Sequence, residues 1–187
     1  MTIYFIRHAQ SRFNAEFWPA KIDPMIPDAP LSPLGERQAQ KAADQVAGLG
    51  IRHVIVSPLT RALQTASLIF GPDQPMQVDP SVREQLCHSC DIGSSPQELK
   101  KNYPHLDFSH LPEIWWHEPS GSEEGVPTPD NIIREPLESL QERAARFVAY
   151  LRTHRLTDTA VVSHGNFIRQ VTGIKPDNCQ VVPFEVS

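Results

Sequence analysis

Apolar residues recur along this chain with two spacings, which predict short strands alternating with amphipathic helices. Runs rich in β-branched residues predict buried strands, at about 2–6, 53–57, 76–78, 159–163 and 180–186. Apolar positions three and four residues apart predict helices, at 33–49, 58–69, 136–151 and 165–173. Strands that alternate with helices build a mostly parallel sheet covered on both faces. The pattern therefore predicts an α/β fold.

Two Ser-Pro pairs predict where helices begin. Serine favours the N-cap position and proline favours the first helical position. Ser32 and Pro33 therefore predict the start of one helix, and Ser57 and Pro58 the start of the next. The second start places Arg61 in the first turn of its helix.

Two of the predicted strands end in a histidine. The apolar run at 3–6 leads directly into Arg7 and His8, and the run at 160–163 leads into His164. Ligands of open α/β sheets bind outside the carboxyl ends of the strands. If these two strands are neighbours, both histidines face one ligand.

The charges near these strand ends favour an anionic ligand. Arg7 and Arg61 are both expected at the same edge of the sheet, and Gly165 opens a helix there. Guanidinium groups and the free amides of a helix N-terminus suit phosphate oxygens. We therefore predict a phosphate site at this edge.

The composition suits one globular domain spanning residues 1–187. A chain of 187 residues with 40% hydrophobic content can bury a sizeable core. The formal net charge of -5 argues against nucleic acid or an anionic membrane as a partner. No run approaches the roughly 18 apolar residues of a membrane span, and the chain does not open with a basic region followed by an apolar signal core. We expect a cytoplasmic protein.

The prolines and aromatic residues predict an irregular insert at about 86–134. Ten of the 18 prolines lie between 72 and 136, and five lie between 19 and 33, so both stretches are expected to be rich in loops. The insert carries Trp115 and Trp116. Their rings suit either a lid that shapes the pocket above the phosphate or the attachment of the insert to the core.

The cysteines do not predict a disulfide framework or a complete metal site. Cys87, Cys90 and Cys179 are an odd number, which suits a reducing compartment. Cys87 and Cys90 have the spacing of half a zinc site, but no second pair at usual spacing completes four ligands. We expect two ordinary thiols, no metal and no cofactor.

Four segments occur in the order of motifs known from one protein family. They are Arg7–Asn14 (RHAQSRFN), Leu31–Ala39 (LSPLGERQA), Ser57–Ala66 (SPLTRALQTA) and Val162–Gly165 (VSHG). Over nearly its whole length the chain resembles the histidine phosphatase superfamily, also known as the phosphoglycerate mutase-like family. The resemblance implies a three-layer α/β/α sandwich.

The resemblance also implies a role for each residue at the phosphate site. His8 is then the nucleophile that becomes phosphorylated, while Arg7, Arg61 and His164 hold the phosphoryl oxygens. Asn14 contributes a further hydrogen bond. The first motif departs from the family at Ala9, where glycine is usual, which matters only if the backbone there needs a positive φ or a very close approach to the ligand.

The proton donor of the family is an acidic residue after the third strand. Glu84, within Arg83-Glu84-Gln85-Leu86, fits this position, and Asp91 and Glu123 are the alternatives. Beside a bound phosphate its proton affinity is expected to rise, so that one carboxyl group can protonate the alcohol and later deprotonate the attacking water.

These features together predict a metal-independent phosphatase that hydrolyses a phosphomonoester of a small metabolite through a phosphohistidine. The two arginines are expected to keep the histidine neutral and to stabilise the transferring phosphoryl group. A phosphoprotein or phosphohistidine phosphatase needs a more open pocket, and cofactor-dependent phosphoglycerate mutases are typically longer. The alternative from another functional class is a catalytically silent phosphate-binding module with the same fold.

Overall fold

Five strands form a single sheet in the computed structural model, which describes residues 2–117 and 125–186. The strands are β1 (Thr2–Arg7), β2 (His53–Val56), β3 (Met76–Val78), β4 (Thr159–Ser163) and β5 (Val181–Glu185). Their order across the sheet is β3-β2-β4-β1-β5. All neighbouring pairs are parallel except β1 and β5, which are antiparallel. The predicted mostly parallel sheet is confirmed.

The helices follow the strands in the predicted alternation. They are α1 (Arg12–Ala20), α2 (Pro33–Val46), α3 (Thr60–Phe70), α4 (Pro96–Asn102), α5 (Leu137–Thr153) and α6 (Gly165–Thr172), with short 3₁₀ helices at Ala47–Leu49, Pro80–Val82 and Ser89–Asp91. Ser32 caps α2 as predicted, because its hydroxyl accepts the Gly35 N–H at 3.0 Å. The pattern of apolar residues did not predict α1, whose start depends on a local cap at Ser11.

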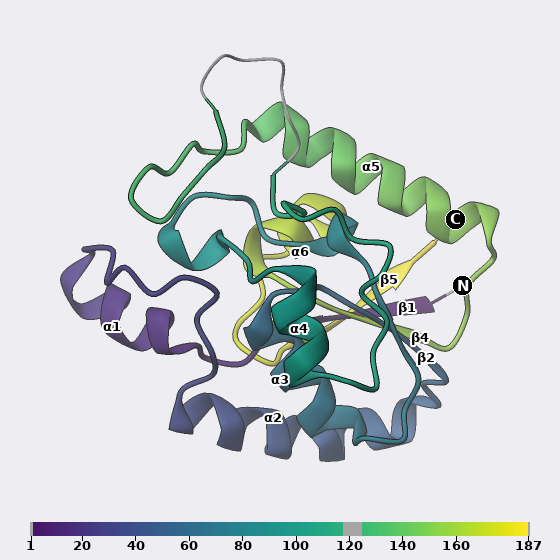
Figure 1. Ribbon diagram of the computed structural model, residues 1–187. Coiled ribbons are helices and arrows are strands. Elements are labelled where there is room, and N and C mark those ends of the chain that lie inside the picture. The colour runs from purple at the N-terminus through teal and green to yellow at the C-terminus, as the bar shows by residue number, and fades with distance from the viewer. Residues whose placement is uncertain (1, 118–124, 187) are drawn as a thin grey trace.

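Helices cover both faces of the sheet, which makes three layers. Alternate residues of one strand point to opposite faces, so Val54 and Val56 pack with the side chains of α2 and α3. Ile55 lies in the other cluster, with side chains of α5 and α6. Figure 1 shows α2 and α3 below the sheet and α5 and α6 above it. The predicted α/β/α sandwich is confirmed.

The predicted start of α3 is wrong. The helix begins at Thr60, and Leu59 at its N-cap position makes no side-chain cap. Ser57 lies two residues before the N-cap position, and its hydroxyl accepts the Leu59 N–H at 3.3 Å and lies 2.8 Å from Nε2 of His164. The carboxylate of Asp28 accepts the Thr60 N–H at 2.7 Å instead. A long-range contact thus replaces the local Ser-Pro signal.

The described residues of the insert at 86–134 lie mainly in loops, and residues 118–124 within it lie outside the described part of the chain. Trp115 is only 3% exposed and belongs to the same core as Val54. Its indole N–H donates to the Ser94 carbonyl at 2.9 Å. Trp115 therefore attaches the insert to the core, whereas the neighbouring Trp116 is half-buried.

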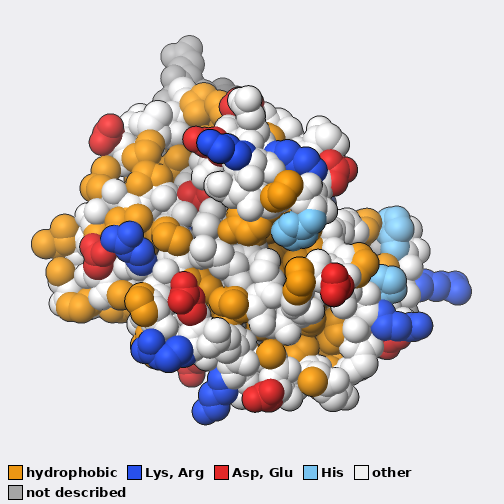
Figure 2. Space-filling model, turned by 60° about the horizontal axis from the view of Figure 1, so that its bottom comes forward, with side chains coloured by type: hydrophobic (Ala, Val, Ile, Leu, Met, Phe, Trp, Pro, Cys, Tyr) orange, Lys and Arg blue, Asp and Glu red, His pale blue; other side chains and the backbone are white. Residues whose placement is uncertain are grey.

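The surface carries charges of both signs. Exposed Glu36, Arg37, Lys41 and Asp44 follow one another along α2. Figure 2, in which the lower side of Figure 1 comes forward, shows acidic and basic side chains interspersed with hydrophobic ones. Within the described residues, no helix is both long enough and apolar enough to cross a membrane.

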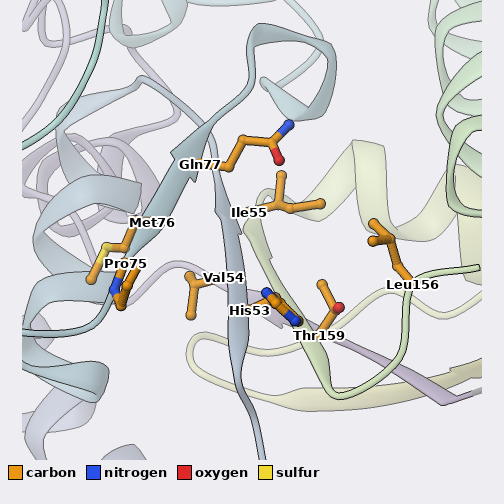
Figure 3. A pocket seen from close by; sticks show the side chains of 8 residues that line it. All are labelled: His53, Val54, Ile55, Pro75, Met76, Gln77, Leu156 and Thr159. Atoms are coloured by element: carbon orange, nitrogen blue, oxygen red, sulfur yellow. The ribbon is translucent and has the colours of Figure 1, made fainter. Parts of the chain in front are cut away.

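The two edges of the parallel strands carry different features. At the amino ends of β2, β3 and β4, a hollow of about 270 Å³ is lined by His53, Pro75, Met76 and Thr159, among others (Figure 3). The carboxyl ends of β1 and β4 lie at the opposite edge, because parallel strands share one direction. The predicted histidines follow those carboxyl ends, so this hollow is separate from them.

Candidate active site

The ends of β1 and β4 bring the two predicted histidines together. These strands pair in parallel with Arg7 opposite Ser163, so the next residue on each strand is a histidine. The His8 N–H donates to the Ser163 carbonyl at 2.9 Å. The ring centroids of His8 and His164 are 5.0 Å apart, and both rings are buried. The register of one strand pair thus creates the predicted pair of histidines.

The ring of His8 is oriented by its own backbone. Nδ1 lies 2.7 Å from the Ala9 carbonyl oxygen, which can only accept a hydrogen bond. In the neutral ring the proton is therefore on Nδ1 and the lone pair is on Nε2. Burial lowers the pKa of His8 well below its ordinary value, and the charges of Arg61 and Arg7 lower this pKa further. Nε2 is therefore available as a nucleophile.

His164 is the N-cap residue of α6, and its ring contacts Ser57, which directly follows β2. Its Nε2 lies 2.8 Å from Oγ of Ser57. Its Nδ1 is buried without a hydrogen-bond partner among the described residues. Burial lowers the pKa of His164 well below its ordinary value, and the charge of Arg61 acts in the same direction. A buried ring nitrogen without a partner is the kind of group that a ligand satisfies.

Arg7 packs against the start of α6. Its Nη1 donates to the Pro176 carbonyl at 2.9 Å, while its buried Nε lacks a partner among the described residues. A β-carbon built on Gly165 would lie 3.5 Å from this Nε, so the guanidinium lies directly over that residue. A cationic donor and the N-terminus of a helix therefore meet at the predicted phosphate site.

Arg61 lies in the first turn of α3 as predicted, and its side chain is held from outside that helix. Its Nη1 donates to the Cys90 carbonyl at 2.6 Å and its Nη2 to Oδ1 of Asp91 at 2.9 Å. The other oxygen of Asp91 accepts the N–H groups of Cys87 and His88, both at 3.0 Å. Asp91, an alternative acid in the sequence, is thus engaged in orienting Arg61.

Glu84 lies just after the 3₁₀ helix at 80–82 and reaches the N-terminus of α6. Its carboxylate accepts the Asn166 N–H, with distances of 3.2 and 3.3 Å to its two oxygens, and the Gln85 N–H at 2.9 Å. Asn166 is the second residue of α6, which begins directly after His164. The structure therefore brings Glu84 to the same helix end as Arg7 and His164. Glu123, the other alternative acid, lies outside the described residues.

The surroundings of Glu84 favour its protonated form. Burial raises the pKa of Glu84 above its ordinary value, and the negative charge of Asp91 raises this pKa further. The hydrogen bonds from Gln85 and Asn166 and the charge of Arg61 oppose this shift. The net direction is upward, which suits a group that must release a proton near neutral pH.

Asn14 serves as a helix cap in this structure. Its Oδ1 accepts the Ser11 N–H at 3.2 Å, and its own N–H donates to the Ser11 hydroxyl at 3.1 Å. These two bonds form a capping box at the start of α1. The predicted hydrogen bond from Asn14 to phosphate would have to come from its side-chain amide group, and it stays a prediction.

The backbone after His8 tolerates alanine in place of the usual glycine. Ala9 is fully buried, and it is not among the residues with a positive φ. Its N–H donates to Oγ1 of Thr65 at 3.0 Å, and that hydroxyl donates to the Arg61 carbonyl at 2.6 Å. The Ala9 methyl group therefore packs in the core without backbone strain and leaves the site geometry intact.

The second motif supports this loop from outside. The Ser32 hydroxyl donates to the side-chain oxygen of Gln10 at 2.7 Å, and the Gln10 N–H donates to Gln38 at 2.9 Å. A β-carbon on Gly35 would lie only 2.0 Å from the Gln10 carbonyl oxygen, so no larger residue fits there without movement of the backbone. The segment 31–39 therefore holds Gln10, two positions after His8, in place.

Two residues near the end of the chain were not predicted to belong to the site. The side-chain amide of Asn178 donates to the His8 carbonyl at 2.8 Å, and Pro176 accepts from Arg7. Both precede β5, and their contacts bridge about 170 positions along the chain. No local spacing indicates them, because their roles depend on the pairing of β5 with β1.

The cysteines of the insert are free thiols in this structure. Cys87 is half-buried and Cys90 is buried. Burial raises the pKa of Cys87 to about 12, and the charge of Asp91 contributes to the shift. Across residues 2–117 and 125–186, no group of three or more histidine, cysteine or acidic side chains is placed to hold a metal ion.

The sequence profile of the histidine phosphatase superfamily (branch 1) matches residues 3–176. The chain belongs to this superfamily. The match contains both histidines, both arginines and Glu84, the residues that the fold brings to the carboxyl edge of the sheet.

Similar proteins of the histidine phosphatase superfamily include mutase-like proteins and phosphatases. The chain is 27% identical over 227 residues to a phosphoglycerate mutase-like protein of Arabidopsis thaliana, with 100% of this chain and 79% of that protein covered. The alpha-ribazole phosphatase of Shigella flexneri superposes with a TM-score of 0.65 at 20% identity, covering 99% of this chain and 90% of that one. The phosphoserine phosphatase of Entamoeba histolytica, solved with 3-phosphoglyceric acid, has a TM-score of 0.60 at 21% identity, with coverages of 98% and 90%. The structural likeness shows that this superfamily member shares their fold.

Proposed function

We propose that this protein is a metal-independent phosphatase that hydrolyses a phosphomonoester through a phosphohistidine formed on His8. One observation carries the proposal. Two buried nitrogens, Nε of Arg7 and Nδ1 of His164, have no hydrogen-bond partner in the described part of the chain, and they occur where a neutral His8 lies beside two guanidinium groups. Buried polar groups in native proteins are almost always paired, so an anion that accepts from both donors completes the site.

In the first step, the lone pair of His8 Nε2 attacks phosphorus. A P–N bond forms while the bond from phosphorus to the ester oxygen breaks. The departing oxygen takes the proton of the Glu84 carboxyl group and leaves as a neutral alcohol. Arg7 and Arg61 stabilise the negative charge on the remaining phosphoryl oxygens throughout the transfer.

In the second step, a water molecule attacks the phosphohistidine. Glu84, now a carboxylate, takes a proton from this water as the new P–O bond forms. The P–N bond breaks, its electron pair returns to Nε2, and inorganic phosphate leaves. One carboxyl group thus serves as acid and then as base, and the enzyme regains its starting protonation state.

A phosphorylated small metabolite is the proposed substrate class. The described insert residues 86–117 are anchored to the core through Trp115, and we expect an anchored insert to restrict the access of a folded phosphoprotein to the site. A phosphoglycerate mutase leaves the phosphoryl group attached to an organic product, whereas a phosphatase releases it as inorganic phosphate. The two activities therefore differ in a measurable product.

The test is the release of inorganic phosphate from a panel of phosphomonoesters by the purified protein, with and without a chelator such as EDTA. We expect hydrolysis of p-nitrophenyl phosphate and of at least one sugar, amino acid or glycerate phosphate at rates that the chelator does not change. Transfer to an acceptor without phosphate release would identify a mutase. Binding of phosphate without any turnover would identify a silent module.

The lowered pKa of His8 and the raised pKa of Glu84 predict how activity depends on pH. Activity should fall as the pH drops through the pKa of His8, because the protonated ring has no lone pair, and this occurs well below the ordinary range of histidine. Activity should also fall as the pH rises through the pKa of Glu84, because the carboxylate cannot protonate the leaving group. Turnover of phenyl phosphate is therefore expected to be highest at mildly acid pH.

The measurement is kcat/KM from about pH 4 to pH 9, which reports the ionisations of the free enzyme, with Glu84→Gln as the comparison. The alkaline decline should be absent from the variant, whose amide does not titrate. An alkaline decline of the same shape in both proteins would assign it to another group.

A further inference from the structure

The segment that carries Glu84 has little regular structure, yet its carbonyl groups are held one after another by side chains. The Pro80 carbonyl accepts from Nη1 of Arg83 at 3.1 Å, and the Val82 carbonyl accepts from the hydroxyl of Ser163 at 2.7 Å. The Ser81 and Arg83 carbonyls both accept from Nη1 of Arg143, at 2.9 and 2.8 Å. Four consecutive carbonyls thus have a side-chain donor.

Arg143, on α5, supplies the donor for two of these four carbonyls. It is 1% exposed, although arginine is rarely buried so completely. Its Nε and Nη2 donate to the two oxygens of Glu135, at 3.1 and 2.7 Å, in a bidentate ion pair. Its Nη2 also lies 3.4 Å from the Glu84 carbonyl. All five N–H donors of the guanidinium group are thereby directed at partners.

Glu135 holds the other side of the same segment. Its N–H donates to the Leu86 carbonyl at 2.9 Å, and its carbonyl accepts the side-chain amide of Gln85 at 3.0 Å. Its carboxylate fixes the direction of the Arg143 fork. Glu84 therefore lies between backbone contacts to Arg143 on one side and to Glu135 on the other.

Arg143 also contacts the second element that holds Glu84. Its Cζ lies 5.3 Å from the centre of the Phe167 ring in α6. Asn166, the residue before Phe167, donates its N–H to the Glu84 carboxylate. A single buried side chain thus links the backbone of Glu84 with the helix end that its carboxylate touches.

We propose that Arg143, oriented by Glu135, is a positioning residue that aligns the carboxyl group of Glu84 for proton transfer. The inference rests on the proposed function, in which Glu84 is the acid. A general acid must come within hydrogen-bond reach of the leaving oxygen, and a displacement of about 1 Å can cost on the order of 10²-fold in rate. Glu84 lies in a segment without a strand or helix of its own, so Arg143 supplies the rigidity that the segment lacks.

The test compares two substrates that differ in their need for an acid. p-Nitrophenyl phosphate has a good leaving group and needs little protonation, whereas phenyl phosphate has a poorer one. Arg143→Lys keeps the charge but replaces a planar fork of five donors by three donors on a flexible stem. We expect this variant to lower kcat/KM, which reports the first transfer step, about tenfold more for phenyl phosphate than for p-nitrophenyl phosphate.

The ratio of the two kcat/KM values does not depend on how much of the protein is folded. A merely structural role of Arg143 would lower both rates equally and leave this ratio unchanged. Glu135→Gln weakens the same fork at nearly constant size and is expected to shift the ratio in the same direction, so it provides the test if Arg143→Lys does not fold. Arg146→Lys, an exposed position on the same helix, is the matched control and should leave the ratio unchanged.

The variant Glu84→Gln distinguishes a failure of the positioning role of Arg143 from a failure of the proposed function. It should shift the ratio at least as far as Arg143→Lys, and adding Arg143→Lys to it should change the ratio little, because the acid is already lost. A shifted ratio in Glu84→Gln with unchanged ratios in Arg143→Lys and Glu135→Gln would overturn the positioning role and leave the proposed function intact. Unchanged ratios in all three variants would overturn the role of Glu84 as well.

Discussion

Replacing His8 by alanine is expected to lower kcat for any phosphomonoester by about 10⁴-fold or more. The reaction then loses the only atom that forms the covalent intermediate, Nε2, whose lone pair is defined by the bond from Nδ1 to the Ala9 carbonyl. Arg7 and Arg61 remain in the variant. Binding of inorganic phosphate should therefore weaken far less than turnover, which calorimetric titration can measure beside the kinetic assay.

The fold of this variant needs its own control, because His8 is buried and its removal leaves a cavity. Near-ultraviolet circular dichroism and the thermal unfolding midpoint report whether the core is intact. His53→Ala is the matched variant, since His53 begins β2 and lines the hollow at the opposite edge of the sheet (Figure 3). It should retain normal kcat.

The proposed covalent intermediate gives a second readout of the same prediction. Rapid quenching of the wild-type protein with a labelled substrate should yield phosphate bound to protein that is released in acid and retained in base, as expected for a phosphoramidate. His8→Ala should yield none. Labelling of the His8→Ala protein at wild-type level would place the nucleophile at another residue.

Replacing Glu84 by glutamine is expected to lower kcat by roughly 10²–10⁴-fold, the usual contribution of an acid-base group. Glutamine keeps the size and the hydrogen-bonding oxygen that accepts the Asn166 N–H, but it cannot release a proton. The loss in kcat/KM, which reports the first transfer step, should be largest for alkyl phosphates and smallest for p-nitrophenyl phosphate. Phosphate binding should stay close to that of the wild type.

Glu36→Gln is the matched control for this variant, because Glu36 is an exposed carboxylate on α2. It should turn over normally. Near-normal turnover of alkyl phosphates by Glu84→Gln would mean that another carboxyl group is the acid. Asp91 already pairs with Arg61 and two backbone N–H groups, so Glu123 would be the next variant to make.

The order of strands and helices could be predicted from the sequence because it depends on local spacing. The apolar residues of α2 recur with the helical period, the strand at 159–163 is one continuous buried run, and Ser32 caps its helix as the Ser-Pro signal indicates. The same signal failed at Ser57. There the helix begins at Thr60, whose N–H donates to the carboxylate of Asp28, 32 positions away, and a long-range contact of this kind has no local trace.

The chemistry of the candidate site could be predicted in part for the same reason. Arg7, His8 and His164 lie at strand ends, and the carboxyl ends of parallel strands meet at one edge of a sheet. The partners of these residues could not be predicted. Asp91 holds Arg61, and Asn178 holds the backbone of His8, across loops whose paths follow no periodic pattern.

The sequence by itself determined the α/β alternation, the four motifs and the residue types that a phosphate site requires, because these properties depend on near neighbours along the chain. The tertiary structure alone decided which side chains orient the residues of the candidate site. The parallel register of β1 and β4 sets the two histidines side by side. The burial of Arg143 among the carbonyls of 81–84 supports the segment that carries Glu84, since only the packing of α5 against the sheet brings these distant groups into contact.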